Sequence, residues 1–132
     1  MLHLPDGLEA VEDNWFGYAD IEKVIISSSV KTLGESAFCR CEKLRQVTFE
    51  PGSQLEEIKA WCFDLCGFEE IIIPKSVRRI GPEAFGSCER LRRVVFEPGS
   101  CLERIENSCF RNCKLEEAFI PKSVRYIENG AF

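Results

Sequence analysis

LRQVTFEPGSQLEEI, at Leu44–Ile58, returns 47 residues later as LRRVVFEPGSCLERI, at Leu91–Ile105. Alignment of residues 42–85 with residues 89–132 makes 26 of the 44 pairs identical. An internal repeat of this size is the signature of a solenoid, in which each unit packs only against its neighbours. We therefore expect function to lie in columns of equivalent positions along the solenoid rather than in one local motif.

The 47-residue period divides into two unlike units of 22 and 25 residues. The ends of successive units are marked by Ala19, Cys41, Cys66, Cys88 and Cys113. These marks predict one solenoid domain, residues 4–132, with about five and a half coils. The predicted coils are 4–19 (partial), 20–41, 42–66, 67–88, 89–113 and 114–132 (truncated). An incomplete last coil would leave an open strand edge near Leu115, which predicts self-association through the solenoid ends.

Each unit begins with an apolar pattern that is typical of a short strand. In one unit it is Leu44, Val47 and Phe49, of which the last two alternate as a strand requires. Because each coil supplies one such strand rich in β-branched and aromatic residues, the strands should stack into a parallel sheet.

Two kinds of turn follow the predicted strands. One reads Glu-Pro-Gly-Ser, as at residues 50–53, and the other reads Pro-Lys-Ser, as at residues 74–76; each recurs 47 residues later. Proline fixes φ and glycine permits positive φ, so both are turn sequences. Beyond the turns, apolar spacings of three and four, as at Leu55, Ile58 and Cys62, indicate short helical or 3₁₀ segments.

A longer pattern resembles a known family. Residues 73–91 read Ile-Pro-x-Ser-Val-x-x-Ile-Gly-x-x-Ala-Phe-x-x-Cys-x-x-Leu. This pattern resembles the BspA-type leucine-rich repeat, and the resemblance extends from Leu4 to Phe132. It implies a leucine-rich-repeat solenoid with short parallel β-strands on the concave face and turns with short 3₁₀, helical or irregular segments on the convex face. It also implies a protein–protein interaction module, in cell-surface adhesion or host interaction.

Charged pairs at the start of each strand form the first candidate binding column. From the second complete unit onward, the two residues after the first apolar position alternate in sign along the solenoid. The candidate partner-binding residues are Glu69, Glu70, Arg92, Arg93, Glu116 and Glu117. Neighbouring strands also let such charges pair across the sheet, worth ~0.2–1 kcal/mol each. A sheet surface that neutralises its own charges is therefore the alternative interpretation.

A second candidate column lies at an outward position between two core residues of each strand. Its members are Ile25, Thr48, Ile72, Val95 and Phe119. Because contiguous exposed apolar patches mark interaction sites and aromatic residues dominate interface energetics, we interpret this column as a contact surface for a protein partner. The alternative is that β-branched residues favour strands whichever way they point.

Composition argues against several other functions. A net charge of -5 does not fit the basic face of a nucleic-acid binder. No apolar run approaches the ~20 residues of a membrane-spanning helix, so we expect no membrane insertion. The single histidine, His3, is expected in a free tail, and Gly34 and Gly81 are interpreted as turn glycines of the repeat. We expect no enzyme activity, cofactor or metal site, because no motif for one is present.

The eight cysteines are predicted to be mostly buried free thiols. Stacked strands lie ~4.7–4.9 Å apart, which exceeds the ~3.5–4.5 Å between the Cβ atoms of a disulfide. Cys39 and Cys101 fall outside the columns and are expected to be the reactive thiols. Reduced cysteines are typical of the cytoplasm, and Met1–Asp6 does not resemble a secretory leader. The alternative function is therefore a cytoplasmic scaffold or a fragment of a longer repeat array. The sequence does not decide between the cell surface and the cytoplasm.

Overall fold

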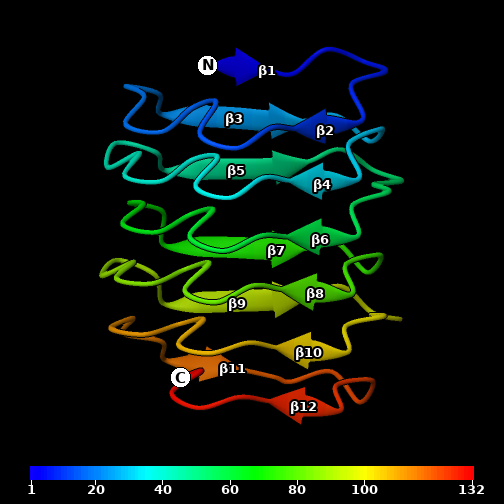
Figure 1. The fold of residues 1–132 in the computed structure, drawn as a ribbon, viewed down its shortest axis with the longest axis vertical. Helices are drawn as coiled ribbons and strands as arrows, with labels where there is room; N and C mark the ends of the chain where they lie inside the picture. The colour runs from blue at the N-terminus through cyan, green and yellow to red at the C-terminus, as the bar shows by residue number, and fades with distance from the viewer.

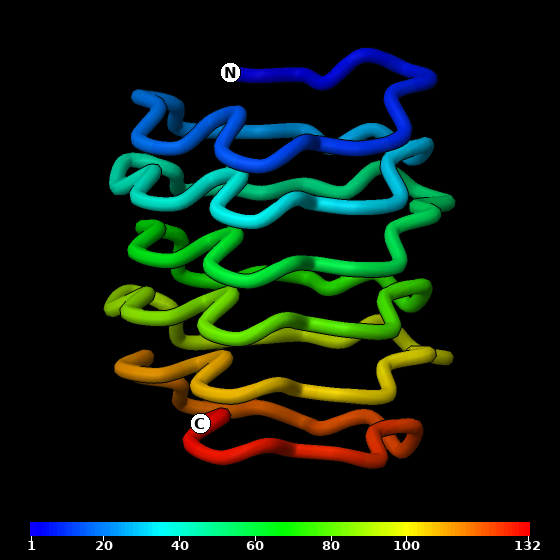
Figure 2. The backbone as a smooth tube through the Cα atoms, in the orientation of Figure 1, coloured from blue at the N-terminus to red at the C-terminus, as the bar shows by residue number.

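Twelve β-strands joined by turns make up the structure, a computed structural model that describes residues 1–132 and contains no helix. Its coils stack along one axis from the N-terminus to the C-terminus (Figure 1). The backbone of each coil follows nearly the path of the coil before it (Figure 2). This stack confirms the predicted solenoid. No helix that could cross a bilayer is present.

Each coil contains one strand on each of two faces. The first face, here called the long-strand face, carries β1 (Leu2–His3), β3 (Lys23–Ile26), β5 (Gln46–Phe49), β7 (Glu70–Ile73), β9 (Arg93–Phe96) and β11 (Glu117–Ala118). The second, the short-strand face, carries β2 (Ala10–Val11), β4 (Thr32–Leu33), β6 (Glu57–Ile58), β8 (Arg79–Ile80), β10 (Arg104–Ile105) and β12 (Tyr126–Ile127). All neighbouring strands pair in parallel.

The short-strand sheet lies where the sequence indicated helical or 3₁₀ segments, so that part of the prediction differs from the structure. The spacing of three comes from successive turns: Ala37 N–H donates to Gly34 O at 3.2 Å, and Cys41 N–H donates to Phe38 O at 3.2 Å. Ser36 and Arg40 have positive φ, at 56° and 58°. Each is the third residue of its turn, and a left-handed residue there prevents the chain from continuing as a helix.

The core is a continuous column of side chains between the two faces. Six phenylalanines stack along it with ring centroids 5.2–5.5 Å apart: Phe16, Phe38, Phe63, Phe85, Phe110 and Phe132. The cysteine that closes a coil donates its thiol to the phenylalanine carbonyl of the preceding coil, as Cys66 does to Phe38 at 3.1 Å and Cys88 does to Phe63 at 3.0 Å. The closing cysteines therefore bind adjacent coils together.

Gly34 and Gly81 begin turns, as predicted, since Ala37 N–H donates to Gly34 O and Ala84 N–H donates to Gly81 O, each at 3.2 Å. Gly34 and Gly81 are absent from the positive-φ residues, and both are buried. A Cβ atom on Gly81 would lie 2.7 Å from Ala60 N, so the position is glycine because neighbouring coils approach closely there. By contrast, Gly52 has a φ of 77°, which confirms the Glu-Pro-Gly-Ser segment as a turn.

The long-strand face is interrupted between β5 and β7. The strands form two separate three-stranded sheets, β1-β3-β5 and β7-β9-β11, whereas the short-strand sheet is continuous through all six strands. Glu50 N–H donates to Ile26 O at 3.0 Å, and Glu97 N–H donates to Ile73 O at 3.1 Å. The equivalent residue after β7 is Pro74, which has no N–H to donate to β5. Proline thus removes one rung of the ladder at the interruption.

Candidate partner-binding face

All five residues of the predicted apolar column lie on the long-strand face. Strand register places Ile25 opposite Thr48 and Ile72 opposite Val95. Phe119 is 77% exposed and Ile72 is 50% exposed, Thr48 is exposed, and Ile25 and Val95 are half-buried. The strand residues next to Ile25 and Ile72 are buried in the core, as alternation requires, whereas beside Phe119 the Ala118 side chain is half-buried and Ile120 is 37% exposed. The outward side of the column is therefore accessible to solvent.

Phe119 lies just beyond β11 and is the most exposed large apolar side chain of the column. Together with Val95 it lines a small hollow of about 150 Å³ at the end of the face. A protruding ring beside a hollow is the kind of arrangement that anchors an interface.

The charged pairs bind one another, in a pattern that the sequence predicted only in part. Arg93 Nη1 lies 2.9 Å from Glu70 Oε2, and Arg92 Nε lies 3.8 Å from Glu116 Oε1. Glu69 pairs with Arg90, at 2.9 Å, rather than with Arg92 or Arg93. These side chains are at least 40% exposed, so each pair contributes about 0–1 kcal/mol.

Not every charged candidate is neutralised in this way. Arg92 also donates from Nη1 to Glu89 O at 3.0 Å, so its guanidinium lies over the turn that precedes β9. Glu117 is opposite Arg93 in register but makes no ion pair. The Glu70–Arg93 pair supports the self-neutralising interpretation of the charges, while Glu117 retains a free carboxylate.

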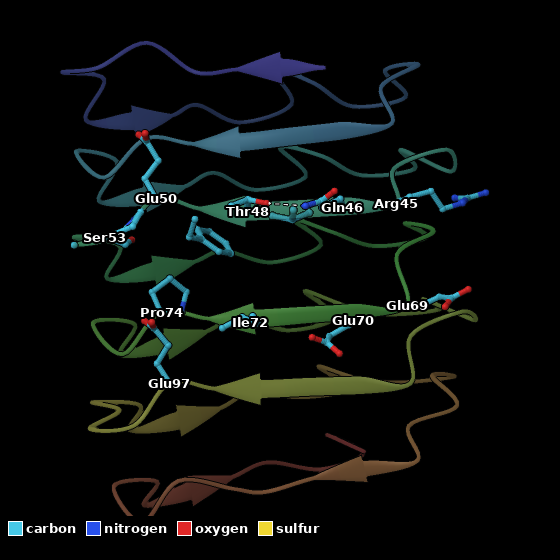
Figure 3. A pocket seen from close by; sticks show the side chains of 14 residues that line it. Arg45, Gln46, Thr48, Glu50, Ser53, Glu69, Glu70, Ile72, Pro74 and Glu97 are labelled. Atoms are coloured by element: carbon cyan, nitrogen blue, oxygen red, sulfur yellow. Dashed lines mark hydrogen bonds between the residues drawn. The ribbon is translucent and has the colours of Figure 1, made fainter.

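A groove of about 700 Å³ lies between β5 and β7, where the ladder is interrupted. Figure 3 shows Thr48 and Ile72 in its middle, with Glu50 and Glu97 toward one end. At the other end, Arg45 Nη1 donates to Glu42 O at 2.7 Å and to Gly67 O at 3.3 Å. Arg45 therefore bridges the two coils that border the groove.

Glu50 and Glu97 were missed because the sequence assigned them only to turns. Both are the first residue of a Glu-Pro-Gly-Ser segment, and they lie 47 residues apart. The sequence did contain a signal for them, because a glutamate recurs directly after the strands that carry Thr48 and Val95 of the apolar column. The sequence did not show which neighbouring coil these carboxylates face.

His3 is not in a free tail, contrary to expectation. It belongs to β1, where it is opposite Ile25, so it continues the outward column by one position. Its Nε2 lies 3.9 Å from Glu50 Oε2. No catalytic partner for an imidazole is formed by this contact.

All eight cysteines are free thiols, and five of them are buried. Cys39 is half-buried, and burial, reinforced by the charge of Asp64, raises the pKa of its thiol. A raised pKa lowers the thiolate fraction, so Cys39 is a poorer nucleophile than predicted. Cys101 is exposed and remains the better candidate for a reactive thiol. No cluster of three or more His, Cys, Asp or Glu side chains is arranged to hold a metal ion.

The short-strand face carries a second set of paired charges that the sequence interpretation did not select. Arg79 pairs with Glu106 at 3.1 Å, and the Arg104 guanidinium lies 4.8 Å from the centre of the Tyr126 ring. Alternating signs one position before the short strands gave the signal, at Glu56, Arg78, Glu103 and Arg125. Because it lacks an apolar column, this face is the weaker candidate for binding.

Parallel coils with one strand of the Leu-x-x-Leu-x-Leu type each, stacked on a shared core, define a leucine-rich-repeat solenoid. The chain belongs to the BspA-type leucine-rich-repeat family, whose sequence model matches residues 9–132 in six copies. Proteins of this family are generally non-catalytic binding modules. Comparison with curated proteins gives no match.

Several solved structures share the fold. The pneumococcal vaccine antigen PcpA is 28% identical, with a TM-score of 0.90 over 96% of this chain and 36% of that chain. A leucine-rich cell surface protein from Faecalibacterium prausnitzii A2-165 is 20% identical, with a TM-score of 0.64 over 99% of this chain and 44% of that chain. A leucine-rich-repeat protein of T. pallidum is 21% identical, with a TM-score of 0.60 over 96% of this chain and 68% of that chain. The chain spans about a third of the length of PcpA.

Proposed function

We propose that the protein binds a protein partner through the long-strand face, in cell-surface adhesion or host interaction. The observation that carries the proposal is the exposed apolar column, with Ile72 and Phe119 as its most exposed members. Water leaves this apolar surface when a partner covers it, and interface cores are built from such residues. Two structural neighbours support the surface role: PcpA, 28% identical, is described as a vaccine antigen, and the F. prausnitzii protein of the same fold is described as a cell surface protein.

The test replaces column residues by lysine and measures binding to purified extracellular-matrix proteins. Ile72→Lys should weaken binding at least about tenfold, because it places a charge in the middle of the apolar contact. Its matched control is Ile127→Lys on the short-strand face, since the two isoleucines are 50% and 53% exposed. The control should leave the affinity unchanged.

A second pair of variants keeps the test decisive if Ile72→Lys does not fold. Thr48→Lys lies in the column on β5, and Thr32→Lys lies on β4 of the short-strand face. Circular dichroism establishes that each variant is folded before binding is measured. Equal affinities for the two threonine variants would overturn the proposal.

A cytoplasmic scaffold is the alternative function, and one observation favours it. All eight cysteines are free, and thiols persist in compartments that keep them reduced. Binding of cytosolic proteins that is lost in Thr48→Lys but retained in Thr32→Lys, with no binding of matrix proteins, would support this alternative. Self-association of the protein through the two ends of the solenoid remains a prediction.

A further inference from the structure

The groove between β5 and β7 combines a cavity with two facing strand edges that carry no ladder hydrogen bonds. Arg93 is the first residue of β9, and its N–H donates to Glu69 O in the preceding coil. Glu70 is the equivalent residue of β7, so its N–H points toward β5. Pro74 offers no donor at the other end of the edge. Backbone groups on both borders of the groove are therefore left without a ladder partner.

The charge of the groove is one-sided. Four glutamates and a single arginine line it: Glu50, Glu69, Glu70, Glu97 and Arg45. Arg90 and Arg93 neutralise Glu69 and Glu70, whereas neither Glu50 nor Glu97 has a lysine or arginine partner.

The environments of these two carboxylates define what can bind beside them. Glu97 Oε1 accepts a hydrogen bond from Lys75 N–H at 2.9 Å, and Glu50 Oε2 lies 3.9 Å from His3 Nε2. Both flank the end of the groove near Pro74, while the exposed Ile72 side chain lies in its middle (Figure 3). The groove thus has an anionic end and an apolar middle.

We propose that this groove selects an extended peptide segment of the protein partner that carries arginine or lysine two residues away from an apolar side chain, so that both point to the same side of the segment. The cation lies between Glu50 and Glu97, and the apolar side chain covers Ile72. Opposite charges across an interface favour the matching partner and reject an acidic one. This inference rests on the proposed function, because it specifies the partner for part of the same face.

A strand of the length of β5 or β7 covers ~13 Å, so a six-residue peptide is a sufficient probe. The probe is a fluorescein-labelled hexapeptide, Arg-Ser-Val-Ser-Arg-Ser, which places arginine and valine on the same side of an extended chain, and its control replaces both arginines by glutamate. The fluorescence anisotropy of each labelled peptide is measured at low salt as the full chain is added. The arginine peptide should bind at least about tenfold more tightly than the glutamate peptide, and added salt should weaken its binding.

The decisive variants change groove charge without removing the fold. The groove pair, Glu50→Gln with Glu97→Gln, keeps an oxygen that can accept from Lys75 N–H and should weaken the arginine peptide about fivefold or more. The control pair, Glu9→Gln with Glu56→Gln, makes the same change in net charge at exposed sites beside β2 and β6 and should change binding less than about twofold.

Equal binding of the two peptides, or equal loss in the groove and control pairs, would overturn this inference. Phe119→Lys separates it from the proposed function, since Phe119 belongs to the column but does not line the groove. If Phe119→Lys and Thr48→Lys weaken binding of the extracellular-matrix proteins while the groove pair does not, only the peptide inference fails. If none of them weakens it, the proposed function fails as well.

Discussion

In each coil, the residues two positions before and two positions after the stacked phenylalanine adopt the left-handed backbone conformation, with positive φ. Ten residues other than glycine adopt it: Asn14, Tyr18, Ser36, Arg40, Trp61, Leu65, Glu83, Ser87, Ser108 and Asn112. A side chain with a Cβ costs ~1–2 kcal/mol in this conformation. The coils keep it because the neighbouring coil fixes the backbone, as in the 2.6 Å bond from Ser87 N–H to Arg111 O.

Replacing one of these residues by glycine should therefore stabilise the protein. Ser87 has a φ of 54° and makes no side-chain hydrogen bond, so Ser87→Gly relieves strain without removing a contact. Glycine adds ~0.4–1 kcal/mol of freedom to the unfolded chain, less than the strain it removes. We expect the free energy of unfolding to rise by about 0.5 kcal/mol, measured by urea denaturation.

Ser28→Gly is the matched control for this prediction. Ser28 is also half-buried in a turn, but its φ is not positive. Glycine there adds unfolded-state freedom with no strain to relieve, so Ser28→Gly should lower stability by ~0.5–1 kcal/mol. A loss of stability in both variants would contradict the strain argument.

At the scale of elements, the same sequence period produces two unlike sheets. The short strands pair through all six coils, while the long strands separate after β5. A proline follows the long strand in the coils of β7 and β11, at Pro74 and Pro121, and β11 keeps only two residues in register with β9. Loss of a donor at the same place in both repeats accounts for weaker pairing on that side.

Amide exchange should reveal the interruption directly. The N–H groups of Glu70 and Ile72 face β5 and have no ladder partner, whereas the equivalent N–H groups of Arg93 and Val95 face β7 within a ladder. Hydrogen exchange followed by NMR should give Glu70 and Ile72 at least about tenfold less protection than Arg93 and Val95. Equal protection at the two pairs would mean that β5 and β7 pair in solution.

The stability of the whole molecule depends on pH through buried cysteine thiols that stay protonated in the folded state. Burial raises the pKa of the Cys62, Cys66 and Cys109 thiols. The pKa of Cys88 is raised first by its hydrogen bond with Cys113 and then by burial. When an unfolded thiol ionises above about pH 8.5, the native state still binds its proton, so the unfolded state binds fewer protons. Stability must then fall as pH rises.

We expect the free energy of unfolding to decrease from about pH 8.5 upward, by as much as ~1.4 kcal/mol per pH unit for each fully protected thiol. Urea denaturation with a reductant present, between pH 7.5 and 9.5, measures the slope. Cys62→Ala removes one buried thiol and should make the slope shallower, whereas Cys101→Ala removes an exposed one and should not. The same slope in Cys62→Ala and the wild type would refute the linkage.

Much of this architecture was determined by the sequence alone, because burial has a period that can be counted. The 47-residue repeat predicted the solenoid, its parallel strands, the column of closing cysteines and the outward apolar column from Ile25 to Phe119. These features follow from which side chains avoid water. Alternation along one strand is enough to reveal them.

Only the tertiary structure decided how neighbouring coils meet. The short-strand sheet, the place of His3 in β1 and the groove between β5 and β7 depend on hydrogen bonds between residues more than 20 positions apart. Two-residue strands are too short to show a period. The sequence identifies Pro74 only as a turn residue, because its effect on strand pairing depends on which strand lies beside it. Glu50 and Glu97 became candidate binding residues because stacking brings their coils to one groove.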